Sequence, residues 1–186
     1  MCKPLRKPNR PRDGYLRLIH VHARPGKPSR GLLGGGNFHL PAALGRGGIR
    51  TDKREGDGGT PRGAFRMVRL WWRADRGVRP RTGLPLRRIG PFDAWCEDPA
   101  DRRYNQALPG KRRGDGDRLW RDDHLYDLVV ELDHNTRPSI RGRGSAVFLH
   151  IARPDFGPTA GCVALRPADL RRLLGRIGAG TRIIIH

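Results

Sequence analysis

The sequence predicts a single, mainly β domain, and both its length and its composition support this prediction. The chain has 186 residues, of which 36% are hydrophobic, and it contains 26 Gly and 16 Pro. A chain of this length fits one domain and can bury roughly 70% of the surface that its unfolded form exposes. Because Gly and Pro are so frequent, the elements should be short and joined by many turns, which favours β structure over a helical bundle.

The predicted strands are short runs of β-branched, aromatic and other apolar residues bounded by turn residues. They cover residues 15–23, 64–72, 127–133, 146–151 and 181–185. A turn-rich hairpin is expected over residues 25–36, and residues 73–90 are expected to form a loop.

One helix is predicted over residues 167–177. Proline suits its first turn, and four apolar residues recur at the helical spacing i, i+3, i+4 and i+7, namely Leu170, Leu173, Leu174 and Ile177. The glycines at positions 178 and 180 should end this helix.

The charge of the chain is strongly positive. Its 38 Lys and Arg against 18 Asp and Glu give a formal net charge of +20, which favours anionic partners. The arginines are scattered from Arg6 to Arg182 and are not concentrated on one helix or interleaved with stacking aromatics. We therefore predict a solvated basic surface with salt-sensitive attraction to acidic wall polymers or nucleic acids, and no specific nucleic-acid site.

The three cysteines do not indicate a disulfide framework or a structural zinc site, because their number is odd and no CxxC pair is present. Cys2 lies in the N-terminal segment, and Cys96, beside Trp95, is expected to be a packing residue. His20 and His22 share one face of the first strand and could hold a metal, but the sequence places no third ligand near them. The tract at residues 110–117 is expected to be a solvated loop without a calcium site. We predict no metal site and no cofactor.

Residues 1–14 are expected to form a basic, flexible tail, followed by a single domain over residues 15–186. The N-terminal segment lacks the 7–15 apolar residues of a secretory signal. No segment approaches the roughly 20 apolar residues of a membrane span. The sequence does not indicate an oligomeric state.

The strongest chemical signal is a cysteine and a histidine in residues 147–165. An apolar run carries His150, a loop rich in Pro and Gly follows, and Cys162 begins a second apolar run. A neighbouring histidine can take the proton of a thiol and make it a nucleophile. Gly161 allows close approach of a substrate, and the N–H groups of Gly161 and Cys162 could bind an oxyanion. The alternative is that Cys162 is a small buried hydrophobe and His150 a structural strand residue.

These residues resemble the signature of L,D-transpeptidase catalytic domains, also called YkuD domains. His150 is followed by Thr-Ala-Gly-Cys-Val-Ala-Leu at residues 159–165, and residues 53–65, after Gly-Arg-Gly-Gly-Ile at 45–49, are similar to the family segment that ends in Thr-Pro-x-Gly-x-Phe. The resemblance covers roughly residues 15–186. It includes the Gly-Arg-Gly-Ser of a compact single-domain subgroup, here residues 142–145. It implies a mainly β fold of mixed sheets or a sandwich with one or two short helices.

The chain departs from the family pattern at two positions. The usual histidine before Gly-Cys is Ala160 here, and the Asn or Arg usual two residues after the cysteine is Ala164. These changes leave the nucleophile and the base in place but bear on substrate preference.

The resemblance implies a cysteine acyltransferase that acts on peptidoglycan stem peptides as donor and acceptor, without a cofactor. Cys162 would be the nucleophile and His150 the base, and the products would be 3–3 or 1–3 cross-links. Such a substrate implies a periplasmic or envelope location, although no signal peptide is visible in the chain. A peptidase or amidase with the same site and a non-enzymatic basic envelope- or nucleic-acid-binding protein remain as alternatives.

Several side chains are candidates for substrate binding, each with a solvated or packing role as the alternative. Arg153 and Arg166 flank the cysteine and could clamp a carboxylate. The others are Thr159 in the loop before the cysteine, Tyr104 and Asn105 in the polar and aromatic loop that starts at residue 95, and Asp123 and Tyr126 near the entry of the strand at 127–133.

Overall fold

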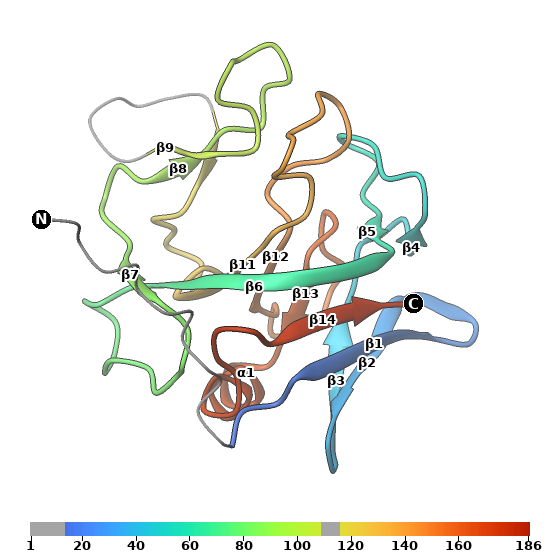
Figure 1. Cartoon of the computed structure of the whole chain (residues 1–186), viewed down its shortest axis with the longest axis vertical. Helices are drawn as coiled ribbons and strands as arrows, with labels where there is room; N and C mark the ends of the chain where they lie inside the picture. Colours follow the sequence, from blue (N-terminus) through green and yellow to red (C-terminus); the bar gives the residue numbers. More distant parts are fainter. Residues whose placement is uncertain (1–13, 109–115) are drawn as a thin grey trace, which may run out of the picture.

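The fold is built around a nine-stranded sheet that closes on itself (Figure 1). A computed structural model describes residues 14–108 and 116–186 of the chain. The strand order is β11-β12-β13-β3-β2-β1-β14-β6-β7, and β11 also pairs with β6, which closes the sheet. The strands are β1 Leu18–Arg24, β2 Lys27–Gly35, β3 Phe38–Ala43, β6 Gly63–Trp72, β7 Leu86–Arg88, β11 Leu128–Leu132, β12 Phe148–Ile151, β13 Val163–Leu165 and β14 Arg182–Ile185.

Smaller elements lie around this sheet. Two short sheets are formed by β4 (Ile49–Arg50) with β5 (Thr60–Pro61), and by β10 (Asp117–Arg118), β8 (Ala94–Trp95) and β9 (Ala107–Leu108) in that order. The single helix of the described residues is α1, Pro167–Leu174. The mainly β fold with one short helix confirms the predicted fold class.

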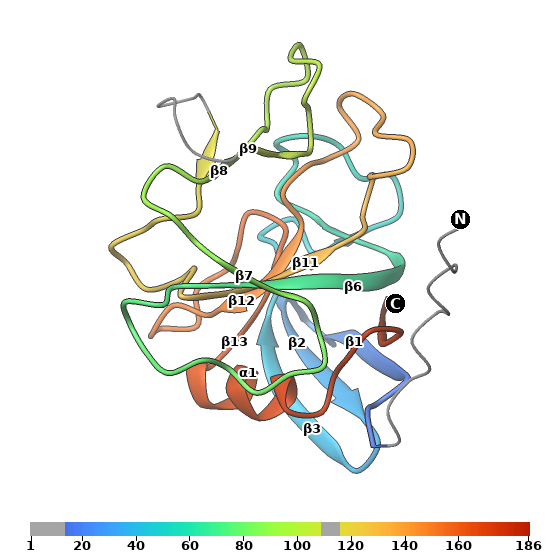
Figure 2. The same cartoon turned by 60° about the vertical axis from the view of Figure 1, so that its left-hand side comes forward.

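Strands β11 and β12 are buried on both faces, and each face contributes to a different hydrophobic core. Val130 and Leu149 point into the closed sheet, where α1 packs against β12. Val129 and Phe148 alternate with them and point outward into a second core with Trp95 of β8. The segment containing β8 and β9 and the helix α1 therefore lie on opposite sides of β6 and β11 (Figure 2). The second core supports the candidate site described below.

The helix begins where the sequence predicts and ends three residues earlier. Pro167 occupies its first turn, and Leu170, Leu173 and Leu174 are buried. After Gly175 the chain tightens, since the Ile177 N–H donates to Leu174 O, three residues back. Ile177 is nevertheless fully buried. The helical spacing of apolar residues therefore predicted correctly which side chains are buried, although the last of them, Ile177, lies beyond the end of the helix.

The five predicted strands are present as β1, β6, β11, β12 and β14, and the predicted hairpin is present between β1 and β2, but residues 25–36 are mostly strand and not rich in turns. Pro25 and Gly26 form the turn after β1, β2 follows as a nine-residue strand, and Gly36 begins the next turn. Its glycines argue against a strand by propensity, yet a Cβ at Gly31 would lie 2.9 Å from His22 O. Glycine at this position allows close packing between strands.

Several expectations concern residues that the structure does not describe. The basic tail, apart from Gly14, and Cys2 lie outside the described residues, as does most of the loop at 110–117. Cys96 is buried, which agrees with a packing role. In the part of the chain that is described, no helix has the length and apolar character needed to cross a membrane.

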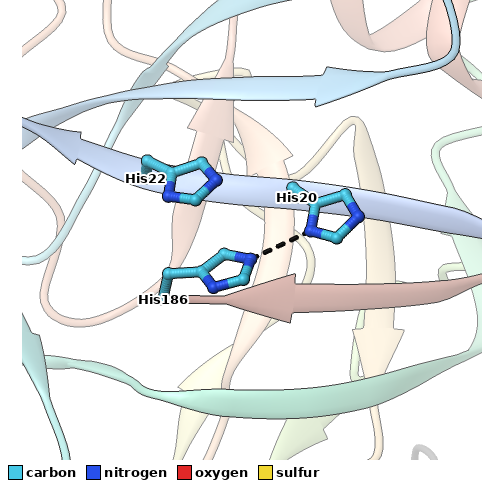
Figure 3. A group of neighbouring side chains, drawn as sticks. All are labelled: His20, His22 and His186. Atoms are coloured by element: carbon cyan, nitrogen blue, oxygen red, sulfur yellow. Dashed lines mark hydrogen bonds between the residues drawn. The ribbon is translucent and has the colours of Figure 1, made fainter.

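The expectation that His20 and His22 have no third ligand nearby is wrong. Strand β1 pairs in parallel with β14, so that Val21 lies opposite Ile185. This pairing brings His186, 164 residues after His22, beside both histidines (Figure 3). Such a contact depends on the closure of the sheet, and local sequence spacing cannot reveal it.

Candidate active site

Cys162 lies immediately before β13, on the outward face of the closed sheet. Its side chain belongs to the second core and is 8% exposed. The Cys162 thiol donates a hydrogen bond to Ala146 O (3.2 Å), and the N–H of Phe148 donates to the sulfur (3.3 Å). The sulfur is thus held by the backbone at the start of β12.

His150 lies on the same face of the sheet as Cys162. In the parallel β12–β13 pair His150 is opposite Ala164, two residues beyond the cysteine, and residues two apart on a strand share a face. Both residues line a pocket of about 490 Å³. They make no direct hydrogen bond to each other in the described structure.

The backbone and Tyr126 orient the His150 ring. Nδ1 lies 2.8 Å from Ile151 O, and only a protonated Nδ1 can donate to that carbonyl. Nε2 is therefore the proton-accepting nitrogen of the neutral ring. The Tyr126 ring packs edge to face against His150 at 5.2 Å, and its hydroxyl donates to Asp117 Oδ2 at 2.5 Å.

Both reactive groups are neutral in the resting protein. Burial raises the pKa of the Cys162 thiol to about 12 and lowers the pKa of the His150 imidazole to about 4. At neutral pH the site therefore holds a thiol and a free base, and not a thiolate and imidazolium pair. Formation of a thiolate in this site therefore requires transfer of the thiol proton to a base.

These pKa directions predict the pH dependence of thiol reactivity. Alkylation of Cys162 by iodoacetamide should be slow at pH 7 and should accelerate about tenfold per pH unit up to pH 10, because the thiolate is the nucleophile and its fraction rises tenfold per unit below the pKa. Peptide-resolved mass spectrometry would separate Cys162 from Cys2 and Cys96. A rate that is already constant above pH 6 would instead demonstrate a preformed ion pair.

Contacts between glycine backbones hold the cysteine loop. Gly161 has φ +144°, and a Cβ there would lie 2.8 Å from Gly59 O. A Cβ at Gly45 would lie 2.1 Å from Gly58 O and 3.0 Å from the Gly161 Cα. The two blocks of the family resemblance, distant in the sequence, thus meet as backbone against backbone beside the cysteine.

Thr159 organises this loop, and its role changes the oxyanion prediction. Its hydroxyl donates to Cys162 O (2.7 Å) and accepts from the Gly161 N–H (3.1 Å). The Gly161 N–H is therefore already engaged in the resting structure, contrary to its expected oxyanion role. The N–H of Cys162 remains the backbone candidate.

Four charged pocket residues were not predicted: Arg46, Glu97, Asp117 and Arg121. Asp117 was expected in a solvated loop, but it lies in β10 and is largely buried, which raises its pKa. Burial, together with Asp117 and Glu55, raises the pKa of Glu97 to about 7. The pocket residues come from segments far apart in the sequence, so no local pattern groups them.

The predicted binding residues divide into two groups. Thr159, Arg153 and Tyr126 line the pocket with Cys162, as do the two departures from the family pattern, Ala160 and Ala164.

The other predicted binding residues do not line this pocket. Arg166 borders a separate pocket, with its guanidinium 5.5 Å from the Phe156 ring. Asp123 forms an ion pair with Arg121 and thereby positions a pocket residue. Tyr104 and Asn105 are buried: Tyr104 donates to Glu55, and Asn105 accepts from the Trp95 indole at 3.0 Å. Because their polar atoms are used in these contacts, both residues support the fold of the loop.

A second pocket, of about 240 Å³, also reaches Cys162. It shares Glu97, Asp117 and Tyr126 with the first pocket and adds Lys53, Glu55 and Ser145. Lys53 and Glu55 belong to the second sequence block of the family resemblance. Their membership of this block could have identified them as candidate site residues. Both pockets therefore border Cys162.

Comparison with known proteins identifies the family to which the chain belongs. No curated protein sequence matches the chain. Among solved structures, Bd1075 of Bdellovibrio bacteriovorus is similar to it, with a TM-score of 0.48 and 18% sequence identity. That match covers 94% of this chain and 49% of the other, so this chain spans about half the length of Bd1075. The family profile described as L,D-transpeptidase catalytic domain (YkuD) matches residues 27–185. The chain therefore belongs to the family of L,D-transpeptidase catalytic domains.

Proposed function

We propose that the protein is a cysteine acyltransferase that cross-links peptidoglycan stem peptides in the cell envelope. The observation that carries this proposal is that Cys162 and His150 line one pocket on the same face of a sheet, within a domain of this family. Family membership supports this class of reaction, and the pocket is lined by a thiol and an imidazole that suit the roles of nucleophile and base.

The first half of the reaction forms an acyl-enzyme. The Cys162 sulfur attacks a backbone carbonyl of the donor stem while its proton passes to Nε2 of His150. The tetrahedral intermediate collapses, the C–N bond breaks, and the leaving amine takes the proton from His150. A thioester and the released C-terminal residue are the products. The Cys162 N–H is the proposed donor to the oxyanion.

The second half transfers the acyl group to an acceptor. An amine of a second stem attacks the thioester, His150 removes its proton, and the Cys162 sulfur leaves and is reprotonated. We propose that the two pockets that border Cys162 receive the donor and the acceptor, an arrangement that would favour transfer over simple hydrolysis.

The charges of the pocket suit a zwitterionic ligand. Arg46, Arg121 and Arg153 supply positive charge, and Glu97 and Asp117 supply negative charge. A stem peptide with a residue such as meso-diaminopimelate carries both carboxylates and an ammonium group. We propose that the arginines bind the carboxylates and that the acidic pair binds the ammonium group.

Arg153 and Arg166 provide a matched pair of variants. Arg153→Ala should raise KM for the donor about tenfold or more with little change in kcat, because a hydrogen bond to a charged group contributes about 1.5–3 kcal/mol. Arg166→Ala should leave both constants unchanged, since Arg166 borders a different pocket. Steady-state kinetics with a purified tetrapeptide donor would measure both. Equal effects of the two variants would remove Arg153 from donor binding.

The experiment that tests the function is incubation of the protein with purified muropeptides, followed by mass spectrometry. A transpeptidase yields dimers, and fragmentation of these dimers distinguishes 3–3 from 1–3 links. Shortened monomers alone would identify the hydrolase instead. Retention of muropeptides without any product, unchanged in Cys162→Ala, would identify a binding protein.

A further inference from the structure

Three histidines form a cluster on the outer surface of the closed sheet, separate from the pocket of Cys162. On β1, Ile19 and Val21 are fully buried in the core, so His20 and His22 point outward. On β14, Ile183 and Ile185 are buried in the same way, and His186 follows on the outward face. The sheet pairing therefore places three imidazoles on one face.

The backbone fixes this arrangement. The parallel pairing sets His20 opposite Ile184 and Val21 opposite Ile185, and the His186 N–H donates to Val21 O at 3.0 Å. His186 thus continues the ladder beyond the last strand residue. The three side chains come from two adjacent, hydrogen-bonded segments, which leaves mainly their side-chain torsions free.

The imidazole nitrogens are close enough to share one ion. One nitrogen from each ring can be chosen so that all three lie within 4.8 Å of one another, and His20 Nδ1 is 2.9 Å from His186 Nε2 (Figure 3). In a tetrahedral site with metal–nitrogen bonds of about 2.1 Å, the ligand nitrogens are about 3.4 Å apart. Adjustments of about 1 Å by the exposed rings would reach this spacing.

The rings of His20 and His22 both contact the ring of His186. His22 and His186 stack at 4.1 Å with ring planes 7° apart, so charging both would place like charges in contact. The contact between His20 and His186 needs one donor and one acceptor nitrogen, so it accommodates a single proton. A cation that accepts lone pairs can replace that proton.

We propose that His20, His22 and His186 form a binding site for a divalent transition metal such as Zn²⁺ or Ni²⁺. Three neutral imidazoles without a carboxylate suit Zn²⁺, Ni²⁺, Co²⁺ and Cu²⁺, whereas Mg²⁺ and Ca²⁺ require oxygen ligands. Three ligands leave room for water or another ligand in the remaining position. The bound ion would link β1 to the end of β14 and so stabilise the closure of the sheet.

The test is calorimetric titration of the untagged full chain with ZnCl₂ after treatment with EDTA. We expect one saturable site, no binding of MgCl₂, and a higher Tm in the presence of Zn²⁺. His22→Ala and His186→Ala should each lower the affinity at least about tenfold, since even the loss of a partner that only supports a metal ligand costs 10–100-fold. Both side chains are exposed, so these variants should fold and keep the Tm of the metal-free protein.

His39 provides the matched control. It is an exposed histidine of β3, in the same sheet, but it is not part of the cluster. His39→Ala should bind Zn²⁺ as the unmodified protein does. The absence of saturable binding, or an equal loss in His39→Ala, would overturn the site. A sulfur-to-cobalt charge-transfer band on addition of Co²⁺ would also overturn it, because the ion would then lie at a cysteine.

Discussion

Replacing Cys162 with serine is expected to abolish acyl-enzyme formation and to lower the rate of cross-linking at least about 1000-fold. The hydroxyl is a much weaker nucleophile than the thiol at neutral pH, and the neutral His150 does not make it a strong one. Intact mass after exposure to a stem-peptide donor or a carbapenem should show the adduct in the unmodified protein and none in Cys162→Ser.

Cys96 is the matched control for this variant. It is also a free, buried cysteine, it lies outside both pockets that reach Cys162, and burial likewise raises the pKa of its thiol. Cys96→Ser should keep the adduct and the activity. An adduct that persists in Cys162→Ser, or disappears equally in both variants, would rule out Cys162 as the nucleophile. His150→Ala should retain the thiol and lose about 100-fold or more of the acylation rate, because it lacks the base.

Replacing Gly161 with alanine is expected to destabilise the protein by about 3 kcal/mol. At φ +144° an alanine is strained, and its Cβ would approach Gly59 O to 2.8 Å. Neither backbone can move without disturbing the cysteine loop or the glycine-rich block. Urea denaturation followed by circular dichroism would measure the loss, and the expected fall in Tm is about 6–12 °C.

Gly175 tests whether this loss is specific to the position. It follows α1 with φ −66° and ψ −12°, and a Cβ there would be 3.6 Å from Arg172 O, an ordinary contact. Gly175→Ala should be neutral or should stabilise the fold by up to about 1 kcal/mol. If Gly161→Ala were equally well tolerated, the contact between the two glycine-rich segments would not be required for the fold.

The spacing of apolar residues along the chain was sufficient to predict those strands and helices whose pattern of burial is visible within the element itself. The apolar run of β12 and the leucine spacing of α1 predicted both elements, because a strand buried on both faces is apolar throughout and the buried face of a helix repeats every 3.6 residues. Strand β2 was missed, since its glycines are explained only by neighbours such as His22 on another strand. Cys162 and His150 were singled out as candidates because they lie close together in the sequence, in the segment that resembles the family signature.

What the sequence by itself determined was the fold class and the family, and it singled out Cys162 and His150 as the candidate reactive pair, since these depend on residue types and on spacing along the chain. The tertiary structure alone decided which charges surround the thiol, that Tyr104 and Asn105 support the fold, and that Asp117 lies in the pocket. It also decided that His186 meets His20 and His22. The physical reason is that these contacts join segments that are distant in the sequence and that only the closed sheet brings together. The pKa of each ionisable side chain in the pocket depends on its burial, which is set only when these segments have come together.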